Sequence, residues 1–184
     1  LLFVFTLLAG GTVLDQKQRG WIFQPSDRSW GNSAALAQDM QDVWINFDSK
    51  ATGSPVKLHG LWLPADPGQA AWNSTKAPVL LLLHGARWNV EGSAPRIRHM
   101  QQLGFSVLAI DYRGFGKSSS DLPSENTAYE DARAAWDWLG TRHPQQPRYI
   151  FGHSLGGAVA IELAARVNDE AGTIVENTFT SIAD

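Results

Sequence analysis

The chain has 184 residues, of which 43% are hydrophobic and 18% are charged, a balance that is ordinary for one folded domain with a sizeable core. Its formal net charge of −3 gives no electrostatic basis for binding nucleic acid. The absence of cysteine excludes disulfides, thiolate metal sites and a cysteine nucleophile.

The first fourteen residues are uncharged and mostly apolar. A helix needs about 20 apolar residues to span a bilayer, so this run is too short by itself. Because the chain does not begin with Met, we interpret residues 1–14 as the remainder of a single N-terminal membrane anchor, which predicts a membrane-associated protein. A signal peptide, whose cleavage gives a secreted or periplasmic protein, and a buried first strand or helix are the alternatives.

Residues 15–38 are rich in Gly, Pro, Ser, Asp and Asn, and they predict an irregular lead-in to a domain over residues 39–184. Two strand-like stretches follow at residues 40–48 and 56–63, with alternating apolar positions. Residues 51–55 between them are typical of turns. The pattern therefore predicts an antiparallel β-hairpin.

From residue 79 onward, apolar strands alternate with helices. The continuous apolar runs indicate strands that are buried on both faces. Alternation of this kind implies right-handed crossovers and a mostly parallel twisted sheet of the α/β class, with the N-terminal hairpin added antiparallel at one edge. The predicted strands cover residues 79–83, 105–111, 148–151 and 172–179, and the predicted helices cover residues 93–103, 125–142 and 155–167.

Ser154 lies between the third of these strands and the helix that follows it, in the sequence Gly-His-Ser-Leu-Gly-Gly. A nucleophilic serine on a strained strand-to-helix turn needs neighbours without bulk two residues away on either side, and Gly152 and Gly156 stand there. The N-terminus of the helix would also direct its dipole and free N–H groups toward developing negative charge. An incidental serine in a glycine-rich turn is the less favoured alternative.

His84, Gly85 and Ala86 follow the first buried strand of this region. Gly85 lets the backbone turn sharply, so that the N–H of Ala86 can point toward the serine. Together with the N–H of Leu155 it would form an oxyanion hole. We expect His84 to fix this loop by hydrogen bonds rather than to act as a base.

The segment Asp-Tyr-Arg-Gly-Phe-Gly-Lys-Ser, residues 111–118, follows the second strand. Its glycines permit a tight turn, which we expect Asp111 and Arg113 to hold through hydrogen bonds. A phosphate-binding loop is excluded because neither Gly-x-x-x-x-Gly-Lys-Ser/Thr nor Gly-x-Gly-x-x-Gly is present. The sequence implies no cofactor and no metal.

These three motifs, in this order and at this spacing, resemble the α/β-hydrolase superfamily. Residues 22–25 and 176–181 look similar to its Bem46-type branch, which includes ABHD13-like and ABHD17-like serine hydrolases. The resemblance implies an α/β-hydrolase fold in which Ser154 matches the nucleophile and Ala86 and Leu155 match the oxyanion-hole positions.

The resemblance also places the acid and the histidine of the triad later in the chain, in the order Ser, Asp, His. None of the five histidines follows Ser154, and the side chain of His153 should diverge from that of its neighbour on a tight turn. We therefore expect a domain whose C-terminal part is missing, truncated before the acid and base of the triad and inactive by itself. Glu176, at the end of the last predicted strand, is a weaker candidate for the acid.

The predicted activity is hydrolysis of carboxylic ester or thioester bonds through an acyl-enzyme on Ser154, with a small-molecule or acylated substrate. Peptide or amide hydrolysis on the same scaffold would use the same serine and stays open. A non-catalytic, hydrolase-like binding protein is the other alternative, and it predicts that even the full-length chain lacks a histidine in a late loop.

Overall fold

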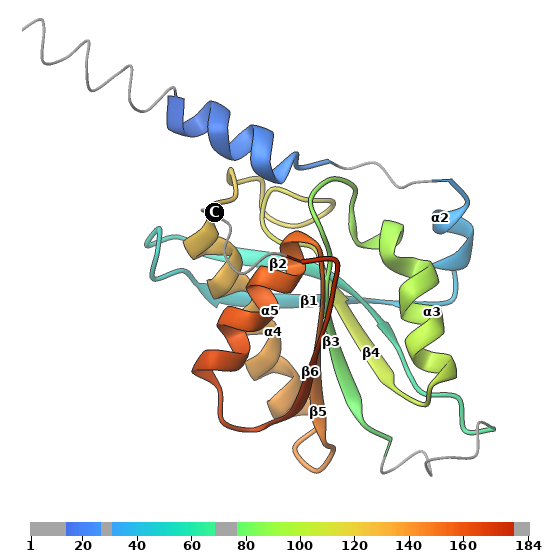
Figure 1. Cartoon of the computed structure of the whole chain (residues 1–184). Coiled ribbons are helices and arrows are strands. Elements are labelled where there is room, and N and C mark those ends of the chain that lie inside the picture. Colours follow the sequence, from blue (N-terminus) through green and yellow to red (C-terminus); the bar gives the residue numbers. More distant parts are fainter. Residues whose placement is uncertain (1–13, 27–30, 69–76, 179–184) are drawn as a thin grey trace, which may run out of the picture.

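The computed structural model describes residues 14–26, 31–68 and 77–178. A single six-stranded sheet with the strand order β1-β2-β4-β3-β5-β6 runs through the centre of the molecule (Figure 1). The strands are β1 (Gln41–Asp48), β2 (Pro55–Leu63), β3 (Val79–Leu83), β4 (Ser106–Ile110), β5 (Arg148–His153) and β6 (Glu170–Glu176).

The pairing of the strands confirms the predicted mixed sheet. β1 and β2 form the expected antiparallel hairpin, and β2 also pairs antiparallel with β4. β4, β3, β5 and β6 are parallel, so their carboxyl ends meet at one edge of the sheet. Loops that follow central strands at this edge are where α/β proteins place their ligands.

Helices cover both faces of the sheet (Figure 1). One face packs against α4 (Glu125–Arg142) and α5 (Leu155–Arg166), and the other against α3 (Ala94–Gln102) and the 3₁₀ turn η1 (Val90–Ser93) that leads into it. The short helix α2 (Ser33–Leu36) contacts η1 and α3. These layers bury the central strands β3 and β4 on both sides.

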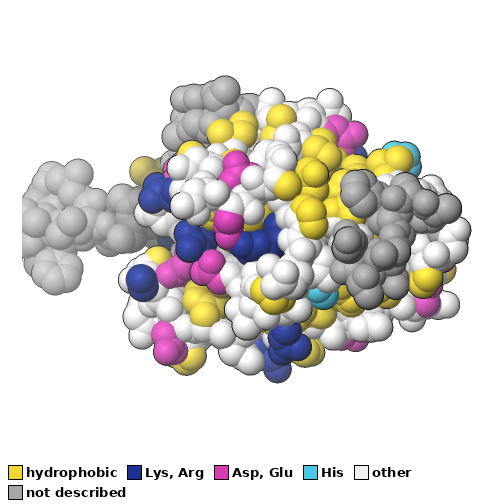
Figure 2. All heavy atoms as spheres, turned by 90° about the horizontal axis from the view of Figure 1, so that it is seen from below, with side chains coloured by type: hydrophobic (Ala, Val, Ile, Leu, Met, Phe, Trp, Pro, Cys, Tyr) yellow, Lys and Arg dark blue, Asp and Glu magenta, His cyan; other side chains and the backbone are white. Residues whose placement is uncertain are grey.

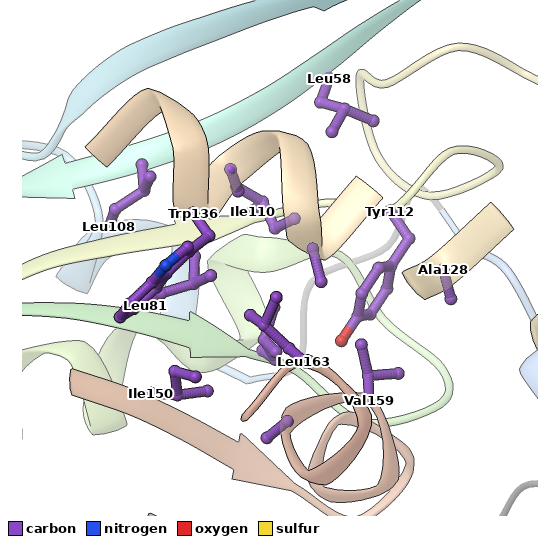
Figure 3. Packing of buried hydrophobic residues seen from close by; sticks show 14 of the residues in the cluster. Leu58, Leu81, Leu108, Ile110, Tyr112, Ala128, Trp136, Ile150, Val159 and Leu163 are labelled. Carbon is purple, nitrogen blue, oxygen red and sulfur yellow. The ribbon is translucent and has the colours of Figure 1, made fainter. Parts of the chain in front are cut away.

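The central strand β3 shows why its sequence is continuously apolar. Successive side chains of a strand point to opposite faces. Leu80 and Leu82 accordingly pack with α3, whereas Leu81 and Leu83 pack with α4 and α5. Figure 3 shows the cluster on the α4 and α5 side of the sheet, where Leu81 lies with Trp136 and with residues of the neighbouring strands.

Helix α4 spans the predicted residues because its ends and its apolar face are both well defined. Ser124 and Thr127 form a capping box, in which the Thr127 N–H donates to Ser124 Oγ at 3.3 Å and the Ser124 N–H donates to Thr127 Oγ1 at 2.8 Å. Such a cap contributes about 1 kcal/mol. Trp136 and Leu139, on one side of the helix, are fully buried against the sheet.

The lead-in over residues 15–38 is less irregular than its composition predicts. A helix covers residues 14–23, and α2 lies within the same segment. Phe23 is 2% exposed and belongs to the main core, whereas Trp21 is 77% exposed. Because Phe23 is the one fully buried side chain among the described residues of this helix, the sequence shows no apolar periodicity there.

The structure contradicts the prediction of a single N-terminal membrane anchor, and with it the predicted membrane-associated location. No helix among residues 14–26, 31–68 and 77–178 is long and apolar enough to cross a membrane. The helix over residues 14–23 carries charged side chains, including Asp15 and Arg19, and spans about 15 Å at 1.5 Å per residue. The remaining residues to which the anchor was assigned, 1–13, lie outside the described ranges.

Figure 2 views the end of the molecule at which the parallel strands begin, away from their carboxyl ends. Basic and acidic side chains lie next to one another over part of this surface. Arg148, at the start of β5, pairs with Asp169, and Arg166 pairs with Glu162 in the last turn of α5. The charges of these residues are therefore matched in pairs at this end of the molecule.

Candidate active site

Ser154 occupies the junction between β5 and α5, where it is the N-cap of the helix. Its backbone has φ 54° and ψ −119°, a conformation that costs a residue with a side chain about 1–3 kcal/mol. Three hydrogen bonds hold this backbone: the Ser154 N–H donates to the Glu176 carbonyl at 2.9 Å, and the Ser154 carbonyl accepts from Gly157 N–H at 2.9 Å and from Thr178 Oγ1 at 2.8 Å. The strained turn is therefore fixed by α5 and by the end of β6.

The glycines around this turn lie where no side chain fits. A Cβ on Gly152 would lie 2.6 Å from the Cα of Gly157 and would overlap the carbonyl oxygen of Gly156. A Cβ on Gly156 would overlap the carbonyl oxygen of Leu83 and lie 2.5 Å from that of His84. The first turn of α5 thus packs directly against the backbone at the end of β3, as expected for a tight strand-to-helix turn.

The loop after β3 lies against the same turn. A Cβ on Gly85 would lie 3.2 Å from the Cβ of Ser154 and 3.3 Å from Nδ1 of His153. Ala86 comes next in this loop, and Leu155 is the first residue of α5. The structure therefore brings the loop that carries Ala86 into contact with the turn that carries Ser154 and Leu155.

His84 is 4% exposed, and its Nδ1 lies 2.7 Å from the carbonyl oxygen of Gly85. A carbonyl only accepts, so Nδ1 carries the proton of this hydrogen bond. Burial lowers the pKa of His84, against an opposing effect of the Asp111 carboxylate, which favours a neutral ring at pH 7. Within the described residues its Nε2 has no hydrogen-bond partner and lies 3.7 Å from Asp111 Oδ1. The hydrogen bond of His84 thus lies within the loop itself, and its role in supporting the site stays a prediction.

Asp111 connects this loop to the hairpin. Its Oδ1 accepts from the Val90 N–H at 2.6 Å, and its Oδ2 lies 3.2 Å from Nδ1 of His59. His59 is 1% exposed, and its Nε2 lies 2.5 Å from Asp42 Oδ1. Burial of His59 opposes its charged form, but the hydrogen bonds to Asp111 and Asp42 raise its pKa overall.

The predicted role of Arg113 in the turn over residues 111–118 needs correction, because its side chain does not bond within that turn. Arg113 Nε donates to Asp131 Oδ1 at 2.9 Å, its Nη2 donates to Glu130 Oε2 at 2.8 Å, and its Nη1 donates to Ser49 Oγ at 3.0 Å. The turn is held instead by Ser118 Oγ, which donates to the Asp111 carbonyl at 2.7 Å. Arg113 therefore joins α4 to the hairpin.

The comparisons with known proteins establish the family of this chain. A family model described as serine aminopeptidase, S33, matches residues 74–184. The alpha/beta hydrolase domain-containing protein WAV2 of Arabidopsis thaliana is 32% identical over 148 residues, which cover 78% of this chain and 44% of that protein. The chain belongs to the α/β-hydrolase superfamily. Its assignment to the finer Bem46-type branch stays a prediction.

Other relatives of this α/β hydrolase are longer than the chain. Lysophosphatidylserine lipase ABHD12 of Danio rerio is 35% identical over 136 residues, covering 68% of this chain and 35% of the lipase. An uncharacterised protein of Mycobacterium tuberculosis is 31% identical over 185 residues, covering 98% of this chain and 61% of that protein. The chain thus spans between about a third and three fifths of the curated relatives named here.

Solved structures confirm the fold of this hydrolase. An α/β hydrolase from Vibrio vulnificus superposes with a TM-score of 0.69 at 22% identity, over 92% of this chain and 59% of that one. The Pyrococcus furiosus esterase Pf2001 superposes with a TM-score of 0.64 at 22% identity, over 84% of this chain and 56% of that one. At these identities the likeness establishes the fold alone.

All five histidines of the hydrolase lie in described ranges, and no hydrogen bond joins any of them to the Ser154 hydroxyl. His59 and His84 are held in the buried network around Asp111. His143 stacks on Trp62, His99 is exposed on α3, and Nε2 of His153 lies 3.9 Å from Glu176 Oε2. Glu176 itself pairs with Arg96, whose Nε donates to it at 2.9 Å. The part of the chain that the structure describes thus has no histidine poised as a base for Ser154.

Two features of the site were not foreseen from the sequence. Arg87 and Trp88 both have positive φ, 65° and 60°, which residue type does not predict for an arginine or a tryptophan. The contact of His59 with Asp111 depends on the pairing of β2 with β4, for which the local pattern gives no signal. Among the described residues, no group of three or more His, Asp or Glu side chains is arranged to hold a metal ion.

Proposed function

We propose that this α/β hydrolase is a serine hydrolase that cleaves carboxylic ester or thioester bonds through an acyl-enzyme on Ser154. The observation that carries the proposal is the strained backbone of Ser154 at the junction of β5 and α5. That conformation is the one a nucleophile elbow requires, and backbone strain of this kind concentrates at functional sites.

In the proposed reaction, Ser154 Oγ attacks the carbonyl carbon of the substrate while a base takes the hydroxyl proton. The carbonyl oxygen becomes an oxyanion and accepts hydrogen bonds from the N–H groups of Ala86 and Leu155. The C–O or C–S bond then breaks, and the leaving alcohol or thiol receives the proton. Water attacks the acyl-enzyme in turn, which releases the carboxylic acid and restores the serine. None of these steps requires a cofactor.

The two oxyanion donors are supported by their positions. Leu155 begins α5, and the first N–H groups of a helix have no partner within that helix. Ala86 follows Gly85, which touches the Ser154 turn. Removing one oxyanion donor typically costs about 3–4 kcal/mol of transition-state stabilisation.

The proposed reaction needs a base for the Ser154 hydroxyl. We assign it to the histidine that the superfamily pattern places after the nucleophile and the acid. The length of the relatives supports this assignment, since the chain spans only 35% of the zebrafish lipase. We accordingly expect residues 1–184 by themselves to show negligible turnover, and a rate comparable to that of the full-length protein would contradict this.

The proposal is tested by measuring hydrolysis of p-nitrophenyl acetate and of an acyl thioester by the full-length protein. Ser154→Ala should lower kcat by about 10⁴-fold or more, since loss of a nucleophile removes the covalent route. Ser54→Ala, an exposed serine in the hairpin turn, is the matched control and should leave kcat unchanged. Turnover by Ser154→Ala at the rate of the unchanged protein would contradict the proposal.

Peptide or amide hydrolysis is a second candidate, favoured by the description of the matching family model as a serine aminopeptidase. The same Ser154 would attack an amide carbonyl, and the leaving group would be an amine. Comparing kcat/KM for an aminoacyl p-nitroanilide with kcat/KM for the ester decides between the two candidates. A larger value for the anilide would favour the peptidase.

A further inference from the structure

A cavity of about 240 Å³ lies beside the Ser154 turn. The loop after β3, the start of α3 and His153 line it. Pockets that hold a whole drug-sized ligand have about 300–1,000 Å³, and this cavity corresponds to about eight waters at 30 Å³ each. Its size therefore suits a small polar group rather than a long acyl chain.

The cavity is adjacent to the proposed chemistry. Gly85 and Ala86 form part of its wall, and a Cβ on Gly85 would lie 3.2 Å from that of Ser154. His153, which also lines it, directly precedes Ser154. A group bound in this cavity would belong to the same substrate molecule as the carbonyl that Ser154 attacks.

The charged side chains that line the cavity are basic: Arg87 and Arg96 contribute, and no Asp or Glu does. The Arg87 side chain is exposed and is absent from the ion pairs that the described residues form. Arg96 is held at the rim by Glu176, which bonds its Nε at 2.9 Å and leaves the terminal nitrogens available as donors. Burial, and then the nearby Arg96, lower the pKa of His153, so that its ring stays neutral at pH 7 and adds no charge.

The backbone of the loop after β3 is strained at two residues that line this cavity. Arg87 and Trp88 are consecutive residues with left-handed backbones, at φ 65° and 60°. The Arg87 N–H donates to the Phe23 carbonyl at 3.1 Å, which ties the loop to the helix over residues 14–23. A Cβ on Gly92 would lie 3.2 Å from the Cβ of Trp88, so a larger residue would displace the tryptophan. Conformations of this kind persist where the surroundings enforce them and cluster at ligand sites.

We propose that this cavity binds a negatively charged oxyanion group of the substrate, such as a phosphate, next to the bond that Ser154 cleaves. Arg87 and the terminal nitrogens of Arg96 donate to the anion, which matches the planar donor geometry of a guanidinium. The substrate class is thus an acyl ester or thioester that carries an anionic group close to the scissile bond. This inference rests on the proposed function for its place in the reaction.

The test measures binding of sn-glycerol 3-phosphate to the protein by isothermal titration calorimetry at low ionic strength, with glycerol and inorganic phosphate as comparison ligands. We expect glycerol 3-phosphate to bind more tightly than either. Arg87→Ala should weaken this binding about tenfold, the effect of losing one hydrogen bond to a charged group. Arg133→Ala removes one exposed arginine from α4 and serves as the matched control, with unchanged affinity expected.

Arg87→Glu is a second variant and should abolish binding, while a melting curve for each variant checks that it folds. Equal affinity in Arg87→Ala, Arg87→Glu and the unchanged protein would overturn the proposal, as would equal binding of glycerol and glycerol 3-phosphate. Equal affinity for inorganic phosphate would overturn the assignment to a substrate group. Binding needs no turnover, so Ser154→Ala should retain it, and a failure of the proposed function is therefore distinguishable from a failure of this site.

Discussion

Two polar regions near the carboxyl ends of the parallel strands are built in opposite ways. Around Arg113, buried charges are matched by partners: its guanidinium bonds Asp131, Glu130 and Ser49, and its own N–H donates to Asp131 at 2.9 Å. Around Ser154 the backbone is strained, and within the described residues the hydroxyl makes no hydrogen bond.

This difference distinguishes residues that stabilise the site from the residue that takes part in the reaction. Buried polar groups whose hydrogen bonds are complete fix a structure, because breaking any one of them leaves a costly unpaired group. A strained residue whose hydroxyl makes no hydrogen bond costs stability and persists because its surroundings hold it. Arg113 therefore belongs to the scaffold of the site, and Ser154 to the reaction.

The largest expected effect on stability comes from Arg113→Met. The change leaves Asp131, which is 0% exposed, without its charge partner, and breaking a buried pair in this way costs about 3–5 kcal/mol. Urea unfolding monitored by circular dichroism measures the loss. Arg133→Met breaks an exposed pair with Asp137 and should cost less than about 1 kcal/mol. Equal effects of the two changes would show that the Arg113 network is not a structural support.

A smaller loss is expected where α5 meets β3. Gly156→Ala forces a Cβ against the carbonyl oxygens of Leu83 and His84, and overpacking against backbone costs about 1–3 kcal/mol. Gly20→Ala is the matched control, since no atom lies within 4 Å of its added Cβ and alanine favours a helix over glycine. Its unfolding free energy should stay the same or increase, whereas a loss at Gly20 as large as at Gly156 would contradict the packing argument.

Ser154 itself should be neutral or unfavourable for stability. Ser154→Ala and Ser154→Gly both remove the hydroxyl, but only glycine tolerates φ 54° without strain. We expect Ser154→Gly to be more stable than Ser154→Ala by about 1 kcal/mol in urea unfolding. A glycine variant that is less stable than the alanine variant would show that the turn at Ser154 is relaxed.

The smallest effect is a pH dependence at His59. Although burial opposes its charged form, its bonds to Asp111 and Asp42 raise the pKa of His59 above its ordinary value of 6.5. The stabilisation from protonated His59 is therefore complete below pH 6.5 and is lost as the pH rises through the higher pKa of the folded state.

The unfolding free energy of the unchanged protein minus that of His59→Gln should accordingly fall as the pH increases from 5.5 to 8.5. Urea titrations at several pH values across this range measure it. A difference that grows with pH would mean that His59 is held neutral in the fold.

The sequence predicted those parts of the molecule that rest on local patterns. The strand predicted over residues 79–83 and the helix predicted over residues 125–142 match the observed bounds of β3 and α4, Val79–Leu83 and Glu125–Arg142. The contact of Gly85 with Ser154 agrees with the close approach expected of the two motifs.

The rest depends on contacts between residues that are distant in the chain. Arg113 bonds Ser49, 64 residues earlier, and His59 bonds Asp111, 52 residues later, so neither pairing leaves a local signal. The strained backbones of Arg87 and Trp88 follow from the packing of their loop rather than from their residue types. Residues 14–23 show no apolar periodicity from which a helix could be predicted, because Phe23 is the one fully buried side chain among the described residues of that helix.

The central claim, that Ser154 is the nucleophile, is tested most directly by covalent labelling of the full-length protein with a fluorophosphonate. Mass spectrometry of the digested product should place the adduct on the peptide that contains Ser154. Ser154→Ala should carry no adduct, whereas Ser54→Ala should be labelled as fully as the unchanged protein. Labelling that survives in Ser154→Ala, or an adduct mapped to another residue, would contradict the account.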